Sequence, residues 1–114
     1  MVLGVTGKDW DESVPTSTEA DGLDVRIPIT PMVKELQALI DEAWLIDETL
    51  LLPATRTLMD LEQTFTEPSG AICVAALVTH KQELAGKKIA AIITGGHLRA
   101  SLLSKVADSC GLSV

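Results

Sequence analysis

Apolar side chains recur at intervals of three and four residues along much of the chain, a pattern typical of helices with one buried face. A hydroxyl at the N-cap followed by proline favours a helix start, so Thr30 and Pro31 predict a helix that runs to about Glu42. A second helix is expected directly after an acidic cap at Asp47 and Glu48; it carries Leu51, Leu58, Met59 and Leu61, and Pro53 inside it removes a backbone hydrogen bond. Further helices are expected over Gly70–His80 after Ser69, and from near Arg99 to Gly111.

Short segments that are apolar or have extended character separate these helices and predict strands. The expected strands or extended pieces are Val2–Val5, Val25–Ile29, Trp44–Ile46, Thr64–Glu67 and Lys88–Ile93. Alternation of strands and helices is typical of a parallel sheet with crossover connections. We therefore expect an α/β fold: residues 1–114 as a single domain, a three-layer fragment with a small, mostly parallel sheet flanked by helices.

Charge and composition narrow the class of protein. The net charge is −7 over 114 residues and the acidic residues are scattered, so nucleic acid and anionic membranes are poor partners. The longest apolar run, Ala71–Val78, is too short to cross a bilayer. Cys73 lies in this run and is expected to be a buried thiol, which favours a reducing, cytoplasmic location.

Aromatic residues make up only 3% of the chain, so the core must be built from aliphatic side chains rather than large rings. A small domain of this kind is marginal alone or is completed by further chain or a partner.

Two turns at expected strand ends are candidates for chemistry. One is Thr94–Gly95–Gly96, where glycines allow backbone to approach a ligand closely; the other is Glu67–Pro68–Ser69–Gly70. Taken singly, a Gly-Gly turn is more often a tight connection, and a carboxylate before a serine is more often a helix start. Strand ends separated by one crossover helix meet at the same sheet edge, which favours a shared site.

The combined pattern resembles one branch of the pyridoxal-phosphate (PLP) enzymes of the tryptophan synthase β fold type. EPSGAICVAALVTHKQELAGKKIAAIITGGHL is similar to the C-terminal signature of the threonine dehydratase and serine racemase branch, and TEADGL and VLGV resemble upstream elements of its catalytic domain. The resemblance implies that Thr94 matches the hydroxyl that bonds the PLP ring nitrogen, with Gly95 and Gly96 in the same turn. Glu67 matches a carboxylate near the ring, and His97 replaces the branch's usual asparagine.

The same resemblance identifies two departures. Thr6 stands where serine racemase-like proteins carry a metal-binding Glu, with Glu12 near the second carboxylate position, so no tight metal site is expected. The branch's Schiff-base lysine, in an SFKxRGA motif, and its Gly-rich phosphate loop have no counterpart in this chain. All six lysines fall in contexts typical of exposed residues: Lys8, Lys34, Lys81, Lys87, Lys88 and Lys105.

The sequence thus favours a partial serine/threonine dehydratase (ammonia-lyase)-like domain, inactive alone, with no catalytic residue of its own and no PLP bound without a partner. Two alternatives stay open: a stand-alone oligomerising or protein-binding module, and one chain of a split enzyme that is active in trans. The expected partners are a second copy or a complementary N-terminal chain, and a small amino acid would be a substrate only of the completed protein.

Overall fold

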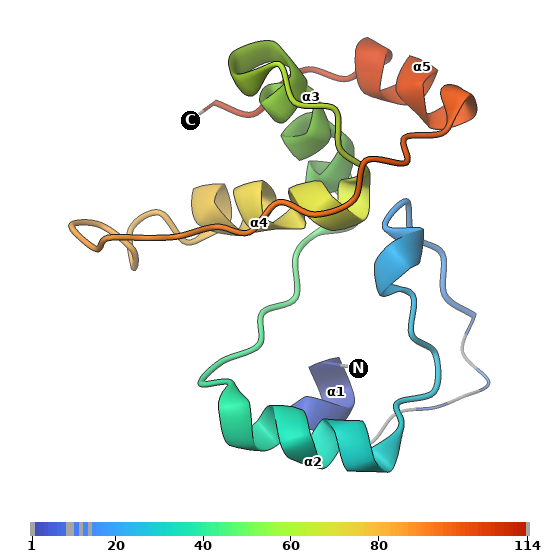
Figure 1. Cartoon of the computed structure of the whole chain (residues 1–114), viewed down its shortest axis with the longest axis vertical. Coiled ribbons are helices and arrows are strands. Elements are labelled where there is room, and N and C mark those ends of the chain that lie inside the picture. The colour runs from blue at the N-terminus through green and yellow to red at the C-terminus, as the bar shows by residue number, and fades with distance from the viewer. Residues whose placement is uncertain (1, 9–10, 12, 14, 114) are drawn as a thin grey trace.

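The computed structural model describes residues 2–8, 11, 13 and 15–113, and its regular elements are all helical within these residues. They are α1 (Val2–Val5), the 3₁₀ turn η1 (Asp21–Leu23), α2 (Thr30–Leu39), the 3₁₀ turn η2 (Glu48–Leu50), α3 (Leu51–Glu62), α4 (Pro68–Thr79) and α5 (Ala100–Asp108) (Figure 1).

The helices form two groups. α3, α4 and α5 pack together with η1 beside them, whereas α1 and α2 pack on each other at the far end of two extended connections (Figure 1). The core between α3 and α4 consists of Ala54, Leu58, Ala71 and Ala75. Three of these four side chains are methyl groups, so the two helices can approach closely, but little apolar area is buried.

The chain is consequently loosely packed. Its radius of gyration is 15.0 Å, compared with about 13 Å for a compact chain of this length. Its accessible surface is 7895 Å², compared with roughly 6,000 Å² for a compact monomer of this mass. About 1,900 Å² of surface that a compact fold would bury therefore remains open.

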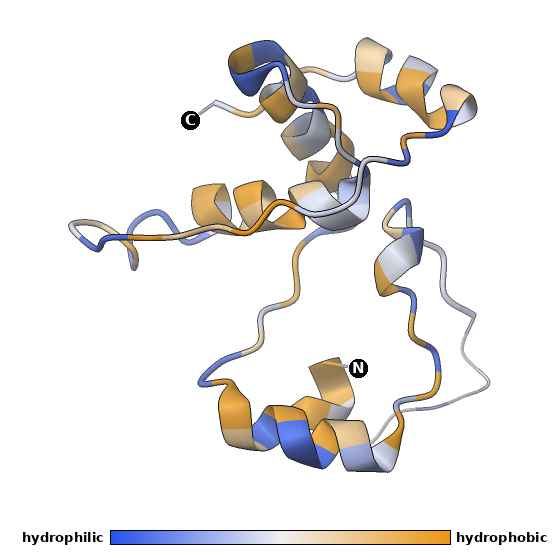
Figure 2. Cartoon of the chain, viewed as in Figure 1, coloured by the Kyte–Doolittle hydropathy of each residue, from blue (hydrophilic) through white to orange (hydrophobic). Residues whose placement is uncertain are grey.

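Much of that surface is apolar. In Figure 2, strongly hydrophobic positions lie along both extended connections and along the segment beside α4. The most exposed large side chains include Ile92 at 80%, and Leu39 and Leu45 at 74% each. Contiguous apolar surface of this kind is typical of an interaction face.

The expected parallel sheet is wrong for this chain: the described residues contain no strand. A strand exists only through a ladder of hydrogen bonds to a neighbour, and the expected strands Trp44–Ile46, Thr64–Glu67 and Lys88–Ile93 form no such ladder. Lys88–Ile93 is extended but lies along a helix, and Val2–Val5 is helical rather than extended. Apolarity identifies segments suited to a sheet without supplying the strands that would pair with them.

The helix predictions are confirmed with small changes at the ends. α2 ends at Leu39 rather than near Glu42, and its N-cap is Ile29 instead of Thr30. α4 begins at Pro68 with Glu67 as N-cap, so Ser69 is not the cap. Pro53 is tolerated in α3 because it lies in the first turn, where a backbone N–H has no helical acceptor.

Asp47 caps the turn that leads into α3, as the sequence predicts. Its carboxylate accepts hydrogen bonds from the hydroxyl and the backbone N–H of Thr49, and these two bonds hold the pKa of Asp47 below its usual value. A lowered pKa means stabilisation that is present above the unfolded-state pKa and lost as the pH falls through the folded-state pKa.

Replacing Asp47 by alanine is therefore expected to lower the thermal midpoint at neutral pH, while Asp47→Asn, which keeps an acceptor, lowers it less. Well below pH 3.8, the ordinary pKa of an aspartate, the difference between the parent chain and Asp47→Ala should shrink to the difference between Asp47→Asn and Asp47→Ala, because the neutral carboxyl keeps only an uncharged acceptor. Circular dichroism melts at both pH values measure it, and a constant difference would mean that the cap is not formed.

Candidate functional site

The candidate site is built around the start of α4. Glu67 has an extended backbone, and Pro68 takes the first helical position, where its fixed φ suits a helix and its missing N–H is not required. The backbone N–H groups of Gly70 and Ala71 both donate to the Glu67 carbonyl, which closes the first turn. The EPSGA sequence thus fixes a rigid helix start against which other segments can pack.

Thr66 ties this helix start to the glycine turn 94–96. Its side chain is fully buried, and its hydroxyl lies 2.8 Å from the carbonyl oxygen of Thr94 and 2.9 Å from that of Gly95. One hydroxyl hydrogen serves both acceptors, so the two carbonyls share a single donor.

Gly70 allows the two segments to meet. A Cβ atom at this position would lie 1.6 Å from the Thr94 carbonyl oxygen and 2.5 Å from the Thr66 hydroxyl. No side chain fits there without moving backbone. Glycine is therefore required at Gly70 by packing, since the closest atom belongs to the main chain rather than to a flexible side chain.

Glu67 lies over the same turn. A Cβ at Gly95 would come within 2.5 Å of the Glu67 carboxylate, and Gly95 has a φ of +70°, a conformation that favours glycine. The Glu67 side chain is partly buried, and the carboxylate also faces Gly22 of η1. The carboxylate is thus enclosed between two glycine backbones.

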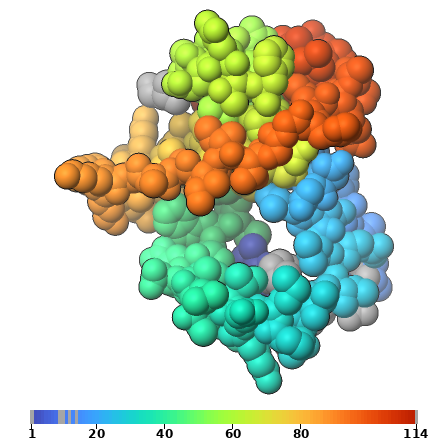
Figure 3. Space-filling model, viewed as in Figure 1, coloured from blue at the N-terminus to red at the C-terminus, as the bar shows by residue number. Residues whose placement is uncertain are grey.

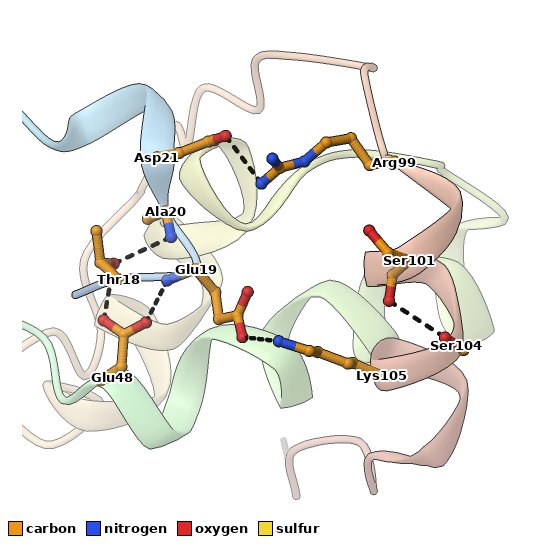
Figure 4. Close-up of polar contacts among 9 residues, drawn as sticks. All are labelled: Thr18, Glu19, Ala20, Asp21, Glu48, Arg99, Ser101, Ser104 and Lys105. Carbon is orange, nitrogen blue, oxygen red and sulfur yellow. Dashed lines mark hydrogen bonds and ion pairs between the residues drawn. The ribbon is translucent and has the colours of Figure 1, made fainter.

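The TEADGL segment, residues 18–23, is the third segment that packs at the candidate site. The Gly22 N–H donates to the Ser69 hydroxyl at 3.0 Å. Figure 4 shows the 3.0 Å ion pair of Asp21 with Arg99, just after the glycine turn. Glu19 pairs with Lys105 of α5. These contacts bring three segments distant in sequence, 19–22, 66–70 and 94–99, to one place.

The structure therefore brings together the residues that the sequence singles out. Glu67 and Gly95 face each other, and Thr94 is bound through its carbonyl, which leaves its exposed hydroxyl without a hydrogen-bond partner in the described part of the chain. Gly96 is open, since a Cβ added there would have its nearest neighbour 3.9 Å away, and His97 is exposed.

Sequence reasoning missed Thr66. A threonine directly before Glu-Pro was the available signal in the sequence, but a hydroxyl in a turn has many ordinary roles.

The metal-site positions do not form a cluster. The Thr6 hydroxyl donates to carbonyls of α1, Glu12 lies outside the described residues, and no three His, Cys, Asp or Glu side chains among the described residues gather around a common point. The lysines named from the sequence are all exposed, and Lys105 is paired with Glu19. Cys73 is only partly buried.

A separate hollow of about 430 Å³ lies between the two helix groups, in the region visible at the centre of Figure 3. Leu23, Val25, Leu45, Leu51 and Ile72 supply much of its apolar wall. None of the four predicted cofactor-contacting residues lines it, so the hollow is distinct from the glycine-turn site.

Comparisons with known proteins find homologues among threonine dehydratases. The chain is 33% identical over 101 residues to the catabolic L-threonine dehydratase TdcB of Staphylococcus aureus strain N315, which covers 86% of this chain and 29% of that protein. Against the TdcB protein of strain USA300 it is 31% identical over 110 residues, 94% of this chain and 32% of the relative. No protein-family profile matches.

The chain thus spans only about a third of the length of these relatives. Across the part of the chain that the structure describes, every helix falls short of the length and apolarity needed to cross a membrane.

Proposed function

We propose that this chain forms the part of a PLP-dependent dehydratase that faces the cofactor ring. It is homologous to catabolic threonine dehydratases over about a third of their length. The single observation that supports this most is the convergence of Thr94, Gly95 and Glu67 on the start of α4. These residues come from the two turns that carry the resemblance.

The residues fit one end of the cofactor. A hydroxyl that is exposed and has no other partner among the described residues, such as that of Thr94, can donate to or accept from a ring nitrogen. A neutral hydroxyl does not force that nitrogen to be protonated, and Gly96, where an added Cβ has its nearest neighbour 3.9 Å away, leaves space on one side of the turn. When bound, PLP supplies the electron sink for loss of the α-proton and elimination of the β-hydroxyl of a serine or threonine.

The residues do not fit the other end. The chain has neither the SFKxRGA lysine nor a Gly-rich phosphate loop, and its lysines are exposed. A covalent PLP site needs an amine held against the aldehyde carbon. We therefore assign no catalytic residue to the chain and propose that it is inactive alone.

Because the chain has residues for the ring end of the cofactor but not for the lysine and phosphate end, we propose that a second polypeptide completes the site. A partner that carries the lysine and the phosphate loop would cover the apolar surface that the chain leaves open, and the chain would contribute the ring-facing turn. A stand-alone interaction module is the other candidate, and it is favoured by the same exposed surface, including Ile92 and Leu39.

The test is to mix the chain with the separately expressed remaining two-thirds of the S. aureus TdcB protein and to follow ammonia release from threonine. We expect activity only in the mixture, and a strong reduction when the chain carries Thr94→Val. Thr79→Val, the same change at an exposed residue near the end of α4, is the matched control. A mixture that binds but stays inactive would favour the interaction module.

A further inference from the structure

Lys88–Ile93 is an extended segment whose residues are all exposed. It lies along α4 between two turns at Gly86 and Gly95, each with positive φ (Figure 1). Exposure alternates: Ile89 and Ile93 are 49% and 40% exposed, while Ile92 is 80% exposed. Residues an even number of positions apart share a face of an extended segment, so Ile89 and Ile93 lie on the less exposed face and Ile92 on the more exposed one.

The backbone of this segment is unpaired. From residue 88 to residue 93, no N–H or C=O makes a hydrogen bond to any residue that the structure describes. An exposed row of such groups on β-branched residues is a template for another strand. Figure 3 shows that the segment runs across the surface of the molecule, where a second chain can reach it.

The segment is complementary to itself in antiparallel pairing. With Ala91 opposite Ala91 on a two-fold axis, Ile89 of one copy lies opposite Ile93 of the other, and Lys88 lies opposite Thr94. Directly opposed residues in an antiparallel pair point to the same face, so the isoleucine pairs share the face towards α4. No like charges oppose each other in this register.

We propose that Lys88–Ile93 pairs with the same segment of a second copy, forming a two-stranded antiparallel ribbon across a symmetric dimer. A second copy suits the segment better than an unrelated strand because the register matches apolar with apolar residues. The chain also has about 1,900 Å² more surface than a compact monomer, compared with about 800 Å² that each partner buries in a standard interface. The proposal does not depend on the proposed function.

Sedimentation of the purified chain over a wide concentration range, together with hydrogen exchange, tests the proposal. We expect a monomer–dimer equilibrium. The backbone amides of residues 88–93 should become protected from hydrogen exchange as the fraction of dimer rises with concentration. Ile92→Lys should weaken the dimer at least about tenfold, since it removes an apolar contact and places charge near Lys88 of the second copy. Ile92 is 80% exposed, so the substitution leaves the monomer intact.

Leu39→Lys is the matched control, because Leu39 is 74% exposed on α2 and receives the same charge. The Leu39→Lys substitution should leave the dissociation constant of the dimer unchanged. A monomer at every concentration, a dimer with unprotected 88–93 amides, or equal weakening by both variants would overturn the proposal. If the amides of residues 88–93 become protected from exchange only when the remaining two-thirds of a dehydratase is added, the proposal is also overturned. Lys88–Ile93 would then pair with that partner instead of with a second copy.

Discussion

Replacing Gly70 by alanine is expected to detach the glycine turn 94–96 from α4 and to lower the free energy of unfolding by about 1–3 kcal/mol. The added methyl group would lie 1.6 Å from the Thr94 carbonyl oxygen, which is backbone and cannot rotate away. Alanine favours a helix over glycine by about 1 kcal/mol, an effect of opposite sign. The clash should prevail, because relieving it requires the whole turn to move.

Urea unfolding followed by circular dichroism measures the stability, and hydrogen exchange at residues 94–99 measures the detachment. Gly96→Ala is the matched control: its nearest neighbour is 3.9 Å away and its φ is not positive. A Gly70→Ala chain as stable as the parent, with unchanged exchange in the turn, would show that the close approach does not exist.

Thr66→Val is expected to cost about 1–3 kcal/mol through a different mechanism. Valine keeps the shape of threonine but removes the only side-chain donor that the Thr94 and Gly95 carbonyls share among the described residues. Because Thr66 is fully buried, water cannot take the place of the hydroxyl without opening the packing. The glycine turn should therefore lose its fixed position while the helices persist.

Thr79→Val provides the comparison, since the Thr79 hydroxyl donates to the Ala75 carbonyl within its own helix and the residue is exposed. Its cost should be small. Equal stability losses in the two variants would mean that the valine side chain, rather than the lost link, causes the effect. In the mixture with the remaining dehydratase segment, Thr66→Val should also reduce activity by misplacing the Thr94 hydroxyl.

The helices can be predicted from sequence because their signals are local. Pro31 marks a start through its own geometry, and the cap at Asp47 forms with a residue two positions away. The sheet prediction fails because pairing is a property of two segments. Lys88–Ile93 has the composition of a central strand, yet the described chain offers it no neighbour.

The two turns that carry the candidate site residues lie together, although the described residues lack the sheet that was expected to hold them. The sequence places two glycine-containing turns at a shared sheet edge; they meet instead at the start of α4, through Thr66 and Gly70. The resemblance identifies Thr94, Gly95 and Glu67 from their order in the chain. The donor that holds the turn escapes prediction, because nothing in the sequence distinguishes the Thr66 hydroxyl from others until its two acceptors are in place.

A chain with a ring-facing turn but no lysine able to hold PLP should not form a defined adduct with the cofactor. The most direct test adds PLP to the purified chain, records absorbance at the band of lysine-bound cofactor, and maps borohydride-trapped lysines by mass spectrometry. We expect no adduct, or weak labelling spread over several exposed lysines. A stoichiometric adduct at a single lysine would contradict this and would make the chain a cofactor-binding protein in its own right.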